Sequence, residues 1–143
     1  MDIENWHPKL VGEDYKILKS PNKNIGDYNC FAYVLDIYDE WHGPTTGSCP
    51  IDKIKRSSRI DNITDYFKIF GYELCDNGEY EKDFDKIAIY VKKGFVTHVS
   101  RQYANKWRIK LGPGYLIEHE LKWLTGYDAE NYGDIGAIIK RSK

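Results

Sequence analysis

Three runs of alternating apolar and polar residues in the second half of the chain limit its possible folds more than any other feature. They cover residues 86–91, 96–103 and 107–111, and only short turns separate them. Side chains that alternate with a period of two belong to strands with one buried face. Because short turns join antiparallel neighbours, the sequence predicts a three-stranded antiparallel meander.

Helical spacing replaces this alternation in two earlier segments. In residues 27–38, apolar side chains stand at the positions of one helical stripe, namely Phe31, Val34, Leu35 and Tyr38. Asn29 is the expected N-cap of that helix, with Asp27 as the alternative. Residues 61–70 repeat the pattern and end at Gly71, a common C-terminal stop.

The remaining segments predict shorter elements. Residues 1–26 are polar and interrupted by Pro and Gly, which indicates an irregular N-terminal arm with one short element over residues 15–18. Residues 40–52 are rich in Gly, Pro, Thr and Ser and predict a loop. A short helix is expected over residues 116–124 and a last strand over residues 135–140.

The length of 143 residues predicts a single domain, residues 1–143, in which the arm 1–26 precedes a core of residues 27–143. The predicted class is α+β, with a helix that carries Cys30 packed on a small antiparallel sheet. Aromatic residues make up 15% of the chain, and the twelve Tyr bring more polar hydroxyls than a core needs. The four Trp likewise bring a polar N–H, so some of the Tyr and Trp residues are expected to line a groove.

Charge and cysteine usage argue against several classes of function. The 21 Lys and Arg and the 22 Asp and Glu are interspersed, so no basic stripe for nucleic acid stands out. No apolar run has the length of a membrane span, and the first ten residues lack a secretory signal, so a cytoplasmic protein without a membrane partner is expected. The three cysteines and four histidines show no metal-ligand spacing, so no metal and no other cofactor is expected. The oligomeric state is left open.

Cys30 is the strongest candidate for a catalytic residue. Either N-cap places its sulfur in the first helical turn, where unpaired N–H groups and the helix dipole favour a thiolate over a thiol. Cys49 in the loop and Cys75 after the second helix lack that setting. The alternative is that Cys30 is a small buried hydrophobic residue.

His98 is the candidate partner of Cys30. It lies near the start of the run 96–103, where an imidazole can accept the thiol proton and return a proton to a leaving group. A cysteine at a helix start and a histidine on the adjoining sheet suffice for acyl transfer, with backbone N–H groups near Cys30 as oxyanion donors. A structural role for His98 is the alternative. Within the loop, Trp41 and His42 either face a ligand or anchor the loop itself.

Two resemblances extend this interpretation. The order of a Cys-bearing helix, a strand, a strand that opens with THVSRQY and a third strand WRIKLG resembles the papain-like cysteine peptidases of the NlpC branch. The segments NCFAY, FGYELC, KIAIYV, THVSRQ, WRIKLG and IEHELKWL, within residues 24–140, resemble an uncharacterised bacterial domain family without an established activity. The first resemblance implies a papain-like fold of NlpC type, with Cys30 as nucleophile and His98 as base.

The same resemblance places Lys110 or a neighbour where the NlpC branch has the residue that orients the imidazole. Lysine has three donors and no acceptor, so it cannot accept a hydrogen bond from a histidine ring. Either Asn29, Gln102, a backbone carbonyl or another group then orients His98, or Lys110 meets an anionic part of the substrate. Gln102 lies roughly 13 Å along the strand from His98. His119 is a further candidate, with an imidazole on a helix surface as the simpler interpretation.

The leading hypothesis is a papain-like cysteine hydrolase or transferase, a peptidase, amidase or deamidase that attacks the amide bond of a peptide or protein through a thioester at Cys30. The alternative is a catalytically inactive binding or interaction module on the same fold, which the lysine at position 110 favours. Nucleic-acid binding through Tyr, Lys and Arg ranks last.

Overall fold

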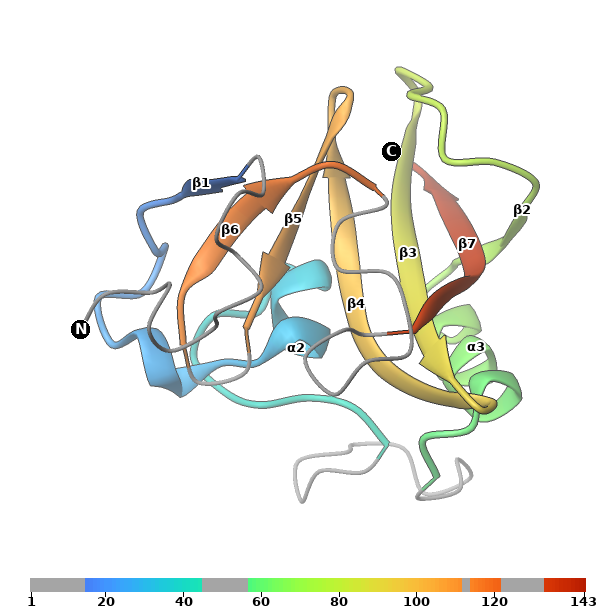
Figure 1. Cartoon of the computed structure of the whole chain (residues 1–143), viewed down its shortest axis with the longest axis horizontal. Coiled ribbons are helices and arrows are strands. Elements are labelled where there is room, and N and C mark those ends of the chain that lie inside the picture. Colours follow the sequence, from blue (N-terminus) through green and yellow to red (C-terminus); the bar gives the residue numbers. More distant parts are fainter. Residues whose placement is uncertain (1–14, 45–56, 112–113, 122–132) are drawn as a thin grey trace.

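The computed structural model describes residues 15–44, 57–111, 114–121 and 133–143 (Figure 1). Within these residues a seven-stranded antiparallel sheet has the strand order β1-β6-β5-β4-β3-β7-β2. The strands are β1 (Tyr15–Ile17), β2 (Glu73–Cys75), β3 (Phe84–Lys92), β4 (Phe95–Tyr103), β5 (Lys106–Lys110), β6 (Leu116–His119) and β7 (Asp134–Ser142). The helices are the 3-10 turn η2 (Ile25–Asp27), α2 (Cys30–Val34) and α3 (Ile60–Lys68). The predicted α+β class is confirmed.

The predicted meander forms the centre of this sheet. β3 pairs with β4, β4 with β5 and β5 with β6, all antiparallel. Ile89 lies opposite Val99, and Arg101 lies opposite Arg108. Because cross-strand partners point to the same face, this register decides which side chains of β4 lie together.

The two faces of the sheet bury different sets of residues. On one face, the helices α2 and α3 pack against the sheet, and their side chains share one core cluster with Ile87, Ile89 and Val99 (Figure 1). On the other face, Ala88, Tyr90 and Trp107 form a second cluster. The strand β3 is thus buried on both faces, which explains its continuous apolar run from Ile87 to Val91.

The α2 helix is shorter than its apolar stripe predicts. Its five residues are followed by the C-cap Leu35 and then by Asp36, whose φ of 61° is left-handed and ends the helical path. The Asn29 side chain accepts a hydrogen bond from the Ala32 N–H, so the predicted N-cap is confirmed. The α3 helix also agrees with its prediction, and Gly71 follows it with a φ of 91°, as a C-terminal stop requires.

The segment 116–124 is not a helix where it is described. Residues 116–119 form β6, which pairs with both β5 and β1. The buried Leu116 packs in the helix-covered cluster, and the buried Ile117 packs in a separate cluster with Ile109 and Leu111. Residues 122–124 lie outside the described residues. The short element predicted within the arm is β1, an edge strand of the sheet, whereas residues 1–14 lie outside the description. The predicted last strand is β7, and β2 was not predicted because only three residues form it.

Candidate functional site

Asn29 ties the start of α2 to the loop that follows this helix. Its Oδ1 accepts hydrogen bonds from the N–H groups of Ala32 (3.0 Å) and His42 (3.1 Å), and its Nδ2 donates to the His42 carbonyl oxygen (2.8 Å). The Trp41 indole N–H donates to the Gly26 carbonyl oxygen at 3.0 Å. Trp41 and His42 therefore anchor their own loop, which is one of the two predicted roles.

Cys30 is the first residue of α2, but it is buried, with only 6% of the residue exposed. Burial raises the pKa of the thiol to about 11, and hydrogen bonds from backbone N–H groups, that of Val99 foremost, lower it only in part. Cys30 is therefore a neutral thiol at pH 7. The prediction of a thiolate is wrong, because the loss of solvent outweighs the N-terminus of a five-residue helix.

Lys110 lies in the same buried layer as Cys30. Its side chain is fully buried, its Nζ donates to the Tyr28 carbonyl oxygen at 3.1 Å, and the Nζ lies 4.5 Å from the centroid of the Tyr28 ring. Burial lowers the pKa of Lys110 to about 8, and the neighbouring Cys30 opposes that shift. These contacts tie β5 to the segment before α2, and the ammonium group is closed to an anionic substrate.

His98 lies on β4 next to Val99, which contacts Cys30, but its side chain points the other way. Val99 belongs to the helix-covered face, and consecutive residues of a strand point to opposite faces. The cross-strand partner of His98 is Tyr90, which belongs to the cluster on the far face. The structure therefore does not bring the Cys30 thiol and the His98 imidazole together, and their pairing stays a prediction without geometric support.

The far face of the sheet holds a second polar group around His119. This histidine lies on β6, not on a helix surface, and is buried. Its Nδ1 lies 2.6 Å from the Glu120 carbonyl oxygen and its Nε2 lies 3.2 Å from the Ser100 hydroxyl. Burial lowers the pKa of His119 to about 4, so the ring is neutral at pH 7. Gln102 donates to the Gly78 carbonyl oxygen at 2.7 Å and does not orient His98.

A surface hollow of about 450 Å³, called here the Arg108 hollow, lies between β5 and the segments on either side of α2. Its lining residues are Tyr33, Tyr38, Tyr103, Lys19, Arg108, Leu18, Ser20, Pro21 and Leu116. This lining includes three tyrosines and two cations but no carboxylate. The prediction that tyrosines line a groove is confirmed here, although the sequence did not indicate which ones.

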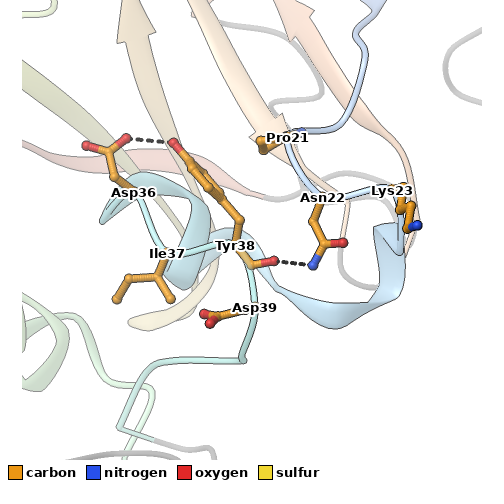
Figure 2. Close-up of a pocket in the computed structure, with 7 residues that line it drawn as sticks. All are labelled: Pro21, Asn22, Lys23, Asp36, Ile37, Tyr38 and Asp39. Carbon is orange, nitrogen blue, oxygen red and sulfur yellow. Dashed lines mark hydrogen bonds between the residues drawn. The ribbon is translucent and has the colours of Figure 1, made fainter.

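Two further hollows adjoin it. The Asp36 hollow, of about 600 Å³, shares Pro21 and Tyr38 with the Arg108 hollow. Figure 2 shows the segment of Asn22 facing that of Tyr38, with the Tyr38 hydroxyl donating to Asp36 at 2.9 Å and Asn22 Nδ2 donating to the Tyr38 carbonyl oxygen at 2.7 Å. The third hollow, of about 370 Å³, shares Tyr103 with the Arg108 hollow and is lined also by Arg101, Asp85 and Lys143.

Comparison with known proteins assigns the chain to a family for which no activity is given. A family model described as a domain of unknown function, DUF7689, matches residues 18–140. The chain belongs to this family. No curated protein and no solved structure matches the chain.

In this DUF7689 chain, the described segments bring together no group of three or more His, Cys, Asp or Glu side chains that would hold a metal ion. None of the described helices combines the length and the hydrophobicity needed to cross a bilayer. Cys49 lies outside the described residues, and Cys75 is half-buried, with its thiol 3.3 Å from the Asn77 carbonyl oxygen. The residues that sequence reasoning missed are Tyr33, Tyr103 and Arg108; Tyr33 lies on α2, far along the chain from the neighbouring strands β4 and β5 that carry Tyr103 and Arg108.

Proposed function

We propose that this domain is a peptide-binding module that works without cysteine chemistry. The observation that carries the proposal is the set of three adjoining hollows around Tyr38 and Tyr103, none of which is lined by Cys30. Tyrosine is common in recognition surfaces because it offers a large rigid ring and a hydroxyl at low entropic cost.

The charges around the hollows favour a peptide over a neutral ligand. The first hollow is lined by Asp36, Asp39 and Lys23. The cations Lys19 and Arg108 line the second, and both signs meet in the third. A ligand that reaches from one hollow into the next therefore passes carboxylates and cations in turn. A polypeptide segment offers amide groups throughout and charged side chains of either sign, so it can complement this pattern.

Arg101 holds the rim between two of these hollows in place. Its guanidinium pairs with Asp36 on one side and with Asp85 (3.5 Å) on the other, and it lies 5.2 Å from the centroid of the Tyr103 ring. The side chain is mostly buried, so these ion pairs are screened less than exposed ones. A rim that is ordered before binding reduces the entropy that a ligand must offset.

A cysteine hydrolase or transferase of papain-like type is the second candidate function, and the NlpC-type architecture belongs to the same proposal. One observation favours it: Cys30 is the first residue of a capped helix, and the Val99 N–H bonds its sulfur. In this reading Lys110, whose charge acts on Cys30, would exchange the proton in place of His98. The depth at which Cys30 is buried is the argument against it.

The reactivity of Cys30 separates the two candidates. In the folded chain we expect iodoacetamide to modify Cys30 at least about 100-fold more slowly at pH 7.5 than a free cysteine in a short peptide, because few thiolates form below the raised pKa. Mass spectrometry of the peptides that contain Cys30, Cys49 and Cys75 measures the three rates together. Unfolding in urea should remove this protection and raise the modification rate of Cys30 to that of the free cysteine. If Cys30 is instead the fastest of the three at pH 7.5, the hydrolase becomes the better proposal.

Peptide selection tests binding directly. We expect a random heptapeptide library displayed on phage to yield sequences that bind the full chain, with binding reduced at least about tenfold by Tyr103→Ala, which removes a ring shared by two hollows. Phe95→Ala is the matched control, because Phe95 is an aromatic residue of the same strand with 47% exposure and lines none of the three hollows. A library that yields no binder, or binders equally sensitive to both changes, contradicts the proposal.

A further inference from the structure

We infer that the Arg108 hollow recognises a carboxylate of the bound peptide, from an acidic side chain or a free C-terminus. This inference rests on the proposed peptide binding and names the group that the central hollow selects. The observation behind it is the lining of the hollow, which contains the cations Lys19 and Arg108 and no carboxylate residue. Such a lining attracts an anion more strongly than a neutral amide.

The Arg108 guanidinium is held in a fixed orientation before any ligand arrives. Its Nε donates to Glu118 Oε2 at 3.0 Å, and its central carbon lies 4.0 Å from the centroid of the Tyr103 ring, which stacks against it. The Tyr33 hydroxyl bonds it from the α2 side. Arginine has five N–H donors, so donors remain after these bonds, and their planar arrangement matches the two oxygens of a carboxylate.

Glu118 does not cancel this preference. It pairs with Arg108 across neighbouring strands, opposite it in the β5–β6 register, and does not line the hollow. The ion pair is partly exposed, so its strength is modest and it orients the guanidinium more than it neutralises the hollow. A ligand carboxylate can therefore approach the free N–H groups of Arg108 from the hollow.

The tyrosine hydroxyls around the same position are uncharged and already engaged: that of Tyr38 donates to Asp36, and that of Tyr33 accepts from Arg108. Burial raises the pKa of Tyr33 further above neutrality, and burial together with the Asp36 hydrogen bond raises the pKa of Tyr38 to about 12. Both hydroxyls therefore keep their protons at pH 7. Uncharged hydroxyls do not repel a carboxylate at the Arg108 guanidinium, whereas phenolates would.

Three peptides of equal length test the inference on the full chain. They are GYGEGYG and GYGQGYG, both acetylated and amidated, and acetylated GYGQGYG with a free C-terminus. We expect at least one carboxylate peptide to bind at least about tenfold more tightly than the doubly blocked glutamine peptide, measured by NMR titration of the ¹⁵N-labelled chain up to ~10 mM peptide. The two carboxylate arms distinguish a side chain from a C-terminus.

Variants of the ion pair assign the effect to Arg108. Arg108→Gln should reduce the preference for a carboxylate to less than about twofold, and Arg108→Lys, which keeps the charge but loses the planar donors, should give an intermediate value. Glu118→Gln should strengthen carboxylate binding about two- to fivefold, because it removes the negative charge that competes for Arg108. The NMR spectrum of each free variant reports whether it is folded.

The outcomes separate this inference from the proposed function. If all three peptides bind equally, the carboxylate inference is overturned and peptide binding stands. If none shifts the spectrum at ~10 mM, where even a millimolar affinity is visible, the carboxylate inference is overturned, and the phage selection decides peptide binding independently. A preference that survives Arg108→Gln and Glu118→Gln unchanged also overturns it.

Discussion

Replacing Asn29 by alanine is expected to lower the free energy of unfolding by at least about 3 kcal/mol. The change removes the N-cap of α2 and leaves the buried N–H and carbonyl groups of His42 without their side-chain partner. A lost cap costs about 1 kcal/mol, and each buried backbone group left unsatisfied costs about 1 to 3 kcal/mol. Urea unfolding monitored by tryptophan fluorescence measures the loss.

The matched control is Asn24→Ala, which is expected to change the stability by less than about 0.5 kcal/mol. Asn24 also precedes a helical segment, η2, but its side chain is exposed and makes no capping hydrogen bond. Equal effects at the two positions would mean that the Asn29 hydrogen bonds do not hold the loop. Asn29→Asp should fall between wild type and Asn29→Ala, because it keeps the accepting oxygen but loses the Nδ2 donor.

The second large effect concerns Lys110 and depends on pH. Between pH 7 and pH 10.5, we expect the stability of the chain relative to its Lys110→Met variant to rise by about 3 kcal/mol, since each unit of pKa shift corresponds to about 1.4 kcal/mol. Burial lowers the folded-state pKa of Lys110 to about 8 from an ordinary value of 10.5. Above pH 8 the unfolded chain therefore binds the extra proton, and the folded state gains stability until pH 10.5.

The comparison is best made in a Cys30→Ala background, because the buried thiol titrates in the same pH range with the opposite sign. The raised pKa of Cys30 contributes stability that is present below the thiol's ordinary pKa and is lost as the pH rises toward about 11. Urea unfolding of Cys30→Ala and of the double variant at several pH values isolates Lys110. A stability difference that stays constant with pH would mean that Lys110 is not desolvated in the folded chain.

The Cys30 thiol also shows why a catalytic role for α2 does not follow from the sequence of this helix. A cap followed by a cysteine is the local pattern of an activated thiol, and the cap itself is present. The thiol is nevertheless covered by β4 and by its own core cluster, and burial dominates its pKa. The local sequence pattern determines where the sulfur lies on the helix. The protonation state of the thiol depends on how much water the rest of the fold leaves around it.

The central strands, α3 and the cap at Asn29 could be predicted from the sequence because each depends on neighbours within a few positions. Period-two alternation defines β3, β4 and β5, and helical spacing with a glycine stop defines α3. The prediction of a helix over residues 116–124 is wrong for residues 116–119, because a short apolar segment is compatible with both a helix and a strand. Pairing with β5 makes these residues the strand β6.

The sequence by itself determined which residues of β4 share a face. Because His98 and Val99 are consecutive, they point to opposite faces of the sheet. Only the tertiary structure decided that α2 packs on the face of Val99, which places the Cys30 thiol on the opposite side of the sheet from His98. The same packing gathered Tyr33, Tyr103 and Arg108 from separate elements into one hollow. The physical reason is that alternation and helical spacing are local, whereas the choice of the covered face depends on the burial of apolar surface summed over the whole chain.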